Sequence, residues 1–326
     1  MNILLYSPAS TVRRNGNRQT SSQWVEMLRE AGHHVRILSH YENEQADLLI
    51  ALHATKSREA ILGFQQSVPG GKVILTLTGT DIYPSPAEEA IDTMMRADAL
   101  ITLQRKAVEK VPKDCQTKTF TVIQSAHRRS NLAEESTHGV VVSVVGHLRD
   151  VKDPLLPARA SRLLNASSEI RIRHAGGILE TKYAALVAAE EKENPRYEWL
   201  GELSEIETAN LIASSHLMVI SSLSEGGARV VGEAVVHGTP VLSSRIDGVI
   251  GLLGDDYPGL FPAGSASSLA KMLSKAERDS FFYATLKKAA LRSAEQFSPE
   301  AEKTSLLSII QKFEQGQKAP LSFPKK

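Results

Sequence analysis

Short segments of nearly continuous apolar residues recur along the first part of the chain, separated by longer segments with helical spacing. They cover residues 2–6, 35–38, 48–52, 73–77, 99–103 and 120–123. A strand that is covered by helices on both faces has apolar side chains at successive positions, which is typical of parallel sheets. Between the first two segments, Trp24, Met27 and Leu28 lie on one face of a helix that ends at Gly32. We therefore expect a doubly wound α/β domain whose ligands bind beyond the carboxyl ends of its strands.

A second series of the same kind begins at residue 139. Its expected strands cover residues 139–145, 170–173, 197–200, 217–220 and 241–243. The polar composition of residues 128–138 indicates a linker. The pattern thus predicts one doubly wound domain at 1–134 and another at 139–298. Residues 299–315 then show the apolar spacing of one more helix, and we expect residues 319–326, which include two prolines, to be frayed.

Composition narrows the class of protein. The chain has 326 residues, of which 42% are hydrophobic and 23% are charged, as in ordinary globular domains. Its 38 Lys and Arg residues nearly balance 37 Asp and Glu residues, so no overall field favours nucleic acid or a membrane surface as a partner. The single cysteine, Cys115, excludes an internal disulfide and a cysteine-cluster metal site. Because residues 2–6 look like a strand rather than a signal peptide, and no apolar run approaches the ~20 residues of a membrane span, we expect a cytoplasmic protein.

The most informative stretch is residues 216–240, where an apolar strand, a small polar turn and a helical pattern follow one another. Glu225 lies in the turn and Glu233 lies inside the helix, so the two carboxylates are roughly 12 Å apart along one axis at about 1.5 Å per residue. Between them lie the free N–H groups of the helix N-terminus, which suit a phosphate. A nucleotide sugar, with hydroxyls at both ends and a diphosphate between, matches this arrangement. The alternative is that Glu225 only caps the helix and Glu233 is a solvated surface charge.

A basic pair follows the first strand of the second domain. Arg149 and Lys152 come shortly after residues 139–145, and Asp153 and Pro154 then begin a helix. Cations at the carboxyl end of a strand are placed to neutralise a phosphate. In the alternative interpretation they are two solvated surface charges.

Polar residues also follow the expected strands of the first domain. They are Gly16, Asn17, Arg18, His53, Thr80 and Asp81. Since parallel strands end at one edge of a sheet, these residues are candidates for binding a substrate. A loop aspartate can instead cap a helix, and a histidine after an apolar strand can be packed and hydrogen-bonded rather than catalytic. The sequence Gly-x-Gly-x-x-Gly does not follow the first strand, which argues against a dinucleotide cofactor.

The segment around Glu225 and Glu233 resembles the Glu-x7-Glu signature of retaining GT4-type glycosyltransferases. This resemblance implies the GT-B fold, in which two Rossmann-like domains face a cleft and a C-terminal helix, here within 299–326, crosses back onto the first domain. It also implies that Glu225 touches the donor hexose and Glu233 the ribose, while backbone N–H groups of Gly227 and Ala228 face the sugar and the β-phosphate.

A second block, Gly146-His-Leu-Arg-Asp-Val-Lys-Asp153, is similar to the family pattern Gly-Arg-Leu-x-x-x-Lys-Gly, whose Arg and Lys clamp the donor diphosphate. Lys152 matches that Lys, but His147 stands at the Arg position, and Arg149 is the candidate replacement. The resemblance implies that Lys152 and Glu225 are catalytic. The implied donor-binding residues are Gly16, His147, Arg149, Lys152, Glu225, Gly226, Gly227, Ala228 and Glu233.

Further blocks resemble one branch of this family, the selenosugar synthases of selenoneine biosynthesis. They are Gly16-Asn-Arg, Leu52-His-Ala, Leu77-Thr-Gly-Thr-Asp-Ile-Tyr, Pro195-Arg-Tyr-Glu-Trp-Leu-Gly-Glu-Leu and Gly251-Leu-Leu-Gly-Asp-Asp-Tyr-Pro-Gly. The branch implies UDP-N-acetylglucosamine or UDP-glucose as donor and selenophosphate as acceptor. The implied acceptor-binding residues are Asn17, Arg18, His53, Thr80 and Asp81. We expect neither a metal nor another cofactor.

Two rival functions share the donor motif. An ordinary GT4 enzyme would glycosylate a hydroxyl of a sugar, a lipid or a small molecule, and would need help in deprotonating it. A non-catalytic nucleotide-sugar-binding protein would bind the donor without turnover. Selenophosphate differs from a hydroxyl acceptor because it arrives as a soft anion, and so needs mainly cations and hydrogen-bond donors.

Overall fold

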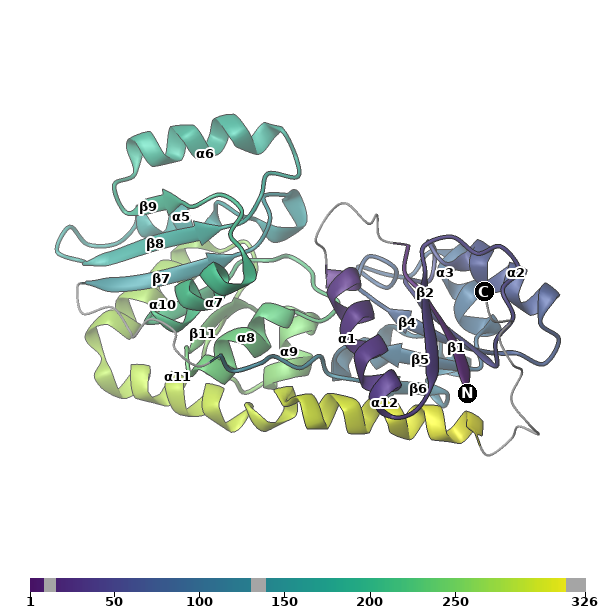
Figure 1. Ribbon diagram of the computed structural model, residues 1–326. Coiled ribbons are helices and arrows are strands. Elements are labelled where there is room, and N and C mark those ends of the chain that lie inside the picture. The colour runs from purple at the N-terminus through teal and green to yellow at the C-terminus, as the bar shows by residue number, and fades with distance from the viewer. Residues whose placement is uncertain (9–15, 130–138, 315–326) are drawn as a thin grey trace. The chain divides into compact units, whose positions relative to one another are not determined.

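The computed structural model describes residues 1–8, 16–129 and 139–314 (Figure 1). The chain forms two compact units. Unit 1 contains Met1–Ser125 and the segment that begins at Pro299, and unit 2 contains Ala126–Ser298. Most of the predicted linker, residues 130–138, and the tail predicted to fray lie outside the described residues.

Unit 1 is a parallel six-stranded sheet with the strand order β2-β1-β3-β4-β5-β6 and helices on both faces (Figure 1). The pleat of β1 directs Ile3 to a core shared with Trp24, and Leu4 to the opposite core, which contains Phe64. Its strands are β1 (Asn2–Tyr6), β2 (His34–Leu38), β3 (Leu48–Leu52), β4 (Lys72–Leu77), β5 (Ala99–Thr102) and β6 (Thr119–Thr121). Its helices are α1 (Gly16–Glu30), α2 (Arg58–Ser67), α3 (Glu88–Arg96), the 3₁₀ helix η1 (Arg105–Lys110), α4 (Lys113–Gln116) and α12 (Pro299–Glu314).

Helix α12 is fixed to unit 1 by a buried carboxylate as well as by apolar contacts. Leu306, Ile309 and Ile310 belong to the same core as Trp24. The Glu302 side chain, in a residue only 1% exposed, accepts hydrogen bonds from Trp24 Nε1 at 2.7 Å and from the backbone and hydroxyl of Ser125 at 2.7 and 2.6 Å. These bonds satisfy a charge that would otherwise be costly to bury.

Unit 2 has the strand order β12-β11-β10-β7-β8-β9, again all parallel. Read from β9, this is the order 3-2-1-4-5-6 of a doubly wound sheet, which reverses direction between β7 and β10. Its strands are β7 (Val140–Val145), β8 (Ile170–Ala175), β9 (Tyr197–Trp199), β10 (Leu217–Ile220), β11 (Val241–Ser244) and β12 (Leu260–Phe261). Its helices are η2 (Asp150–Lys152), α5 (Leu156–Ser161), α6 (Lys182–Glu193), α7 (Glu205–Ala213), α8 (Arg229–His237), α9 (Asp247–Leu253), α10 (Ala266–Arg278), α11 (Ser280–Arg292) and η3 (Glu295–Phe297).

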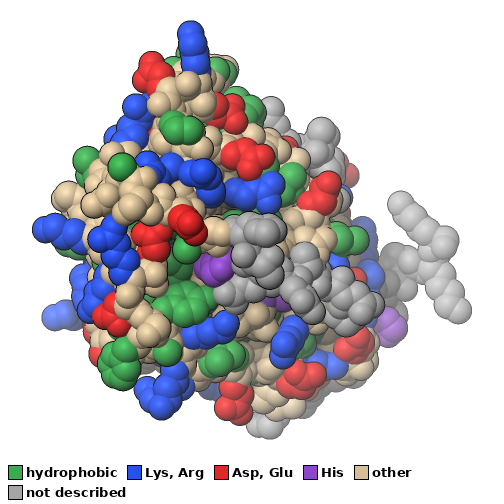
Figure 2. Space-filling view, turned by 90° about the vertical axis from the view of Figure 1, so that its left-hand side faces the viewer, with side chains coloured by type: hydrophobic (Ala, Val, Ile, Leu, Met, Phe, Trp, Pro, Cys, Tyr) green, Lys and Arg blue, Asp and Glu red, His purple; other side chains and the backbone are tan. Residues whose placement is uncertain are grey.

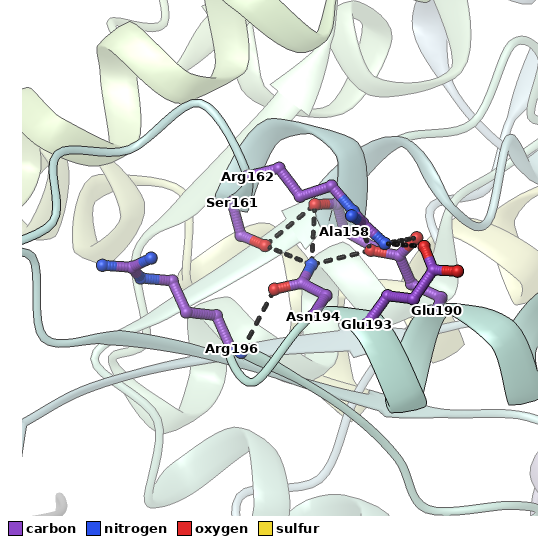
Figure 3. Close-up of polar contacts among 7 residues, drawn as sticks. All are labelled: Ala158, Ser161, Arg162, Glu190, Glu193, Asn194 and Arg196. Carbon is purple, nitrogen blue, oxygen red and sulfur yellow. Dashed lines mark hydrogen bonds and ion pairs between the residues drawn. The ribbon is translucent and has the colours of Figure 1, made fainter.

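A buried asparagine joins α5 to the turn between α6 and β9 (Figure 3). The Asn194 amide donates to the carbonyl of Ala158 at 3.1 Å, to Ser161 Oγ at 3.0 Å and to Glu190 Oε1 at 2.7 Å. Its oxygen accepts from the backbone of Arg196. This network is structural, because it ties α5 to the end of α6 and to the turn before β9.

The predicted fold class is confirmed, since both sheets are parallel and carry helices on both faces. Two details differ from the sequence pattern. Helix α1 begins at Gly16, so Gly16 and Asn17, which the pattern placed only after the first strand, lie in the first turn of a helix. Strand β12 was not predicted, because its two residues are too few to form a recognisable apolar segment.

Two global properties complete the description. No helix in the described ranges has the length and apolar character that crossing a membrane requires. On the face shown in Figure 2, basic and acidic side chains are intermixed, in keeping with the balanced charge of the chain.

Candidate functional site

The reversal of strand order in unit 2 brings the two predicted catalytic residues together. Lys152 follows β7 and Glu225 follows β10, which are adjacent strands. Lys152 Nζ lies 2.5 Å from Glu225 Oε1, and Ser222 Oγ also lies 2.5 Å from that oxygen. The lysine side chain is 20% exposed and the glutamate side chain 13%. The three residues line a pocket at the carboxyl ends of β7 and β10, where doubly wound sheets bind ligands.

The loops that carry Lys152 and Glu225 are hydrogen-bonded to each other. Ser221 Oγ donates to the Lys152 carbonyl at 2.9 Å, and the Leu223 N–H donates to the Val151 carbonyl at 2.8 Å. Asp153, directly after Lys152, has a left-handed backbone with φ of 38°, which reverses the chain toward α5. Both side chains are therefore positioned by one connected pair of loops.

A buried histidine fixes the start of the lysine loop. His174 Nε2 donates to the Gly146 carbonyl at 3.0 Å, and Nδ1 accepts from the Tyr197 hydroxyl at 2.9 Å. Burial lowers the pKa of His174 to about 4, so the ring is neutral at physiological pH. Gly176 permits this approach, because a Cβ there would lie 2.0 Å from the Gly146 oxygen.

The residue at the family's arginine position is a neutral donor. The Gly177 N–H donates to His147 Nδ1 at 3.1 Å, which leaves the ring proton on Nε2. Burial lowers the pKa of His147, the charges of Arg149 and Lys152 act in the same direction, and Glu202 opposes them. Arg149 Nε is buried, and no hydrogen-bond partner for it lies among the described residues. The charges of Arg149 and Lys152 therefore both act on His147, and of these two cations it is Lys152 that lines the pocket.

The turn after Glu225 leads directly into α8. Gly226 and Ala228 are buried and Gly227 is half-buried. No side chain caps the N-terminus of α8 at Ala228, and the first turn holds no acidic residue. Its first N–H groups are available to an anion.

Glu233 is more constrained than a solvated surface charge. Its side chain is 28% exposed, and Oε1 lies 3.5 Å from Arg229 Nε one turn earlier. Burial raises the pKa of Glu233, and Arg229 acts against this shift. The alternative that Glu225 only caps the helix also fails to describe its contacts, which are with Lys152 and Ser222.

Three positioning residues escaped the sequence analysis. Ser222 binds Glu225, and His174 binds the lysine loop. Gly248, in the first turn of α9, supports Glu225 from behind: a Cβ at Gly248 would lie 2.2 Å from the Glu225 carbonyl oxygen. For Gly248, the available signal was the turn-like Asp247-Gly248 pair shortly after the strand that ends at Ser244.

In unit 1 the strand order reverses between β1 and β3, and the predicted acceptor residues follow these strands and β4. Gly16, Asn17 and Arg18 form the first turn of α1. His53 is buried, and its Nε2 lies 3.0 Å from Thr80 Oγ1. Thr80 itself is exposed.

The Asp81 carboxylate accepts hydrogen bonds from backbone N–H groups, as a capping residue does. Its two oxygens accept from the backbone N–H groups of Ala54 at 2.9 Å, Gly79 at 2.7 Å, and Thr78 at 3.0 and 3.1 Å. Because the carboxylate is buried and both of its oxygens are engaged, it orders the loops after β3 and β4 and is not placed to bind a ligand itself. Within the described ranges, no three His, Cys, Asp or Glu side chains are grouped so that they could hold a metal ion.

Comparison with known proteins agrees with this geometry. The family model described as "Glycosyl transferases group 1" matches residues 126–293, a little over half of the chain. Among solved structures, HepE from Anabaena in complex with UDP has a TM-score of 0.76 at 15% identity, covering 96% of this chain and 100% of that one. A glycosyltransferase from Rickettsia africae has a TM-score of 0.76 at 14% identity, with coverage of 97% and 99%. Sucrose-phosphate synthase from Thermosynechococcus elongatus also reaches 0.76, at 16% identity, with coverage of 97% and 100%. At such identities the likeness shows the fold alone. No curated protein matches the sequence.

Proposed function

Since the chain belongs to the group 1 glycosyltransferases, we propose that it transfers a hexose from a UDP-sugar to selenophosphate. The selenium atom attacks the anomeric carbon, the bond from that carbon to the UDP oxygen breaks, and UDP leaves. Water then cleaves the P–Se bond and releases phosphate. The product is a hexose with selenium on its anomeric carbon.

The donor half of this proposal rests on the Lys152–Glu225 pair beside the uncapped N-terminus of α8. In the donor complex Lys152 moves its charge to the diphosphate, and Glu225 accepts hydrogen bonds from the hexose. The N–H groups of Gly227 and Ala228 bind the β-phosphate and the sugar. As charge builds on the leaving phosphate, these groups stabilise it. HepE, which shares this fold, has been crystallised with UDP and with UDP-glucose.

The neutral His147 changes how the diphosphate is held. Lys152 and Arg149 supply the positive charge, and His147 adds a hydrogen bond from Nε2 without a charge. Glu233, on the same helix as the phosphate-binding N–H groups, accepts from the ribose hydroxyls. We propose that Gly16 and Gly226 complete the donor site through backbone contacts, and that no metal takes part.

The acceptor half is supported by two lines of reasoning. The sequence blocks that resemble selenosugar synthases occur in both units, at Leu52–Ala54 and Leu77–Tyr83 as well as Pro195–Leu203. In addition, the strand ends of unit 1 offer donors and a cation for an oxyanion: the first turn of α1 with Asn17 and Arg18, and the Thr80 hydroxyl.

Assay of the acceptor separates this proposal from its rivals. The protein is incubated with UDP-N-acetylglucosamine or UDP-glucose, with or without selenophosphate, and UDP release and the mass of the product are measured. We expect UDP and a selenium-containing hexose only when selenophosphate is present, with no change on adding a chelator. Release that needs a hydroxyl acceptor would favour an ordinary glycosyltransferase, and tight UDP binding without turnover on any acceptor would favour a non-catalytic binding protein.

A further inference from the structure

The loops after β3 and β4 in unit 1 are joined by two contacts between residues 27 positions apart. His53 Nε2 lies 3.0 Å from Thr80 Oγ1, and the Ala54 N–H donates to Asp81 Oδ2 at 2.9 Å. His53 has a left-handed backbone with φ of 76°, which is uncommon for a residue other than glycine. Such strain is maintained only where the surroundings fix it, and functional sites are a frequent location.

The direction of each hydrogen bond in this group can be deduced. The Lys56 backbone N–H, which can only donate, points to His53 Nδ1 at 3.4 Å. Nδ1 is therefore unprotonated, and the proton of the neutral ring is on Nε2. Nε2 then donates to Thr80 Oγ1, so the hydroxyl proton of Thr80 is directed to another acceptor. The contacts of Oγ1 among the described residues include no such acceptor.

The titratable groups at this edge are unsuited to removing a proton from a substrate. His53 Nδ1 is occupied by a backbone N–H, and both oxygens of Asp81 are occupied by three others. Burial lowers the pKa of His53, Lys56 adds to this shift and Asp81 opposes it. Lys56 also places a positive charge beside the ring. Among the described residues, the loops after β3 and β4 thus offer a hydroxyl proton and a cation but no free base.

We propose that the loops after β3 and β4 form a donor-only subsite for a phosphate-type oxyanion, in which His53 is a positioning residue that fixes the Thr80 hydroxyl as the donor. This inference rests on the proposed function and specifies its acceptor class. A hydroxyl acceptor would find no base in these loops, whereas a selenophosphate oxygen can accept from Thr80. An alcohol oxygen can also accept from Thr80, but it must lose a proton that no described group of these two loops is free to take, whereas selenophosphate has no such proton to lose.

The first test concerns the histidine alone and needs no turnover. Imidazole nitrogen NMR of the full chain, with the His53 signals assigned by their loss in His53→Asn, should show a neutral ring protonated on Nε2. A ring protonated on Nδ1, or charged at neutral pH, would overturn the inference.

The second test uses inorganic phosphate as the probe. Calorimetric titration should show that Thr80→Val weakens phosphate binding about tenfold or more, the scale of one hydrogen bond to a charged group, while Thr80→Ser retains it. His53→Asn tolerates the left-handed backbone but is too short to reach Thr80, and should weaken binding in the same direction. UDP affinity should be unchanged in all three variants. Equal phosphate affinity in Thr80→Val and the unmodified protein would refute the subsite.

Kinetics then distinguish failure of this inference from failure of the proposed function. If both hold, Thr80→Val raises KM for selenophosphate and leaves KM for the UDP-sugar unchanged. Turnover with selenophosphate that is insensitive to Thr80→Val refutes the subsite alone. Loss of phosphate affinity in Thr80→Val, in a protein that uses only hydroxyl acceptors, refutes the proposed function while the oxyanion subsite stands.

Discussion

Lys152 Nζ and Glu225 Oε1 lie 2.5 Å apart although the residues are 73 positions apart in the sequence. The pair forms because the strands before the two residues are neighbours where the sheet of unit 2 reverses its order. Each residue neutralises the other in the free protein. When a nucleotide sugar binds, the lysine can turn to the diphosphate while Ser222 keeps Glu225 in place.

Removing either member of this pair should therefore affect the chemical step. Lys152→Ala and Glu225→Ala are each expected to reduce kcat by roughly a hundredfold or more, the scale of losing one charge-stabilising contact in a transition state. The check is steady-state UDP release at saturating donor. Lys192→Ala, which removes an exposed lysine from α6, is the control and should keep full activity. If Lys152→Ala were as active as this control, Lys152 would have no role in the chemical step.

Glu233 should act on binding of the donor. Glu233→Ala is expected to raise KM for the UDP-sugar at least as clearly as it lowers kcat, because the ribose loses a hydrogen-bond acceptor. Binding of UDP, measured by calorimetry, should weaken in parallel. Glu193→Gln on α6, an exposed carboxylate of the same unit, serves as the control. Unchanged UDP affinity in Glu233→Ala would refute the ribose assignment.

The ionisation of Glu233 should make UDP binding depend on pH. Because burial raises the pKa of Glu233, its carboxylate gains a proton at a higher pH than an ordinary glutamate does. UDP affinity should fall as the pH is lowered toward that raised pKa, and Glu233→Gln should bind with a flatter pH profile. Identical profiles for the two proteins would contradict this expectation.

Most of the fold follows from the sequence, because each buried strand is a short apolar run and each helix between them has one apolar face. The order of the strands within each sheet cannot be deduced in this way, because any two of these apolar strands would bury a similar surface if they were neighbours. The order is what places Lys152 beside Glu225, so the sequence indicates that both bind a donor but not that they bind each other.

The residues that sequence reasoning missed act through contacts visible only in three dimensions. Gly248 matters because Glu225 packs against its α-carbon, and His174 because its ring reaches the Gly146 carbonyl. Glu302 did leave a signal: it falls on the same helix face as Leu306, Ile309 and Ile310, where a charged residue needs a buried partner.

Glu302 should be important for the stability of unit 1. Glu302→Ala leaves the Trp24 and Ser125 donors without their acceptor, and we expect the free energy of unfolding of unit 1 to fall by about 3 kcal/mol or more. Urea unfolding followed by Trp24 fluorescence, in a Trp199→Phe background, measures this unit. Glu300→Ala, at an exposed position of the same helix, is the control. Equal midpoints for the two variants would show that the buried carboxylate is dispensable.

His174 should make unit 2 sensitive to acid. Its pKa is about 4 in the folded protein, against 6.5 for an exposed histidine, so the unfolded chain binds the proton first as the pH falls. Stability is thus unaffected above pH 6.5 and is lost as the pH falls from there toward 4. Between about pH 7 and about pH 5 the loss should be about 2 kcal/mol.

This loss is measured against a variant that cannot titrate. In a Trp24→Phe background, Trp199 fluorescence reports urea unfolding of unit 2 for the protein with His174 and for His174→Gln. Between about pH 7 and about pH 5, the protein with His174 should lose about 2 kcal/mol of unfolding free energy relative to His174→Gln. A difference that is independent of pH would mean that the ring is not buried in its neutral form.

The most direct measurement is a crystal structure of the protein with bound UDP. We expect the diphosphate between Lys152 and the N-terminal N–H groups of α8, with the ribose hydroxyls on Glu233 and the Lys152–Glu225 bond exchanged for bonds to the ligand. A nucleotide bound elsewhere, with Lys152 still on Glu225 and Glu233 turned to solvent, would contradict this assignment of the donor site.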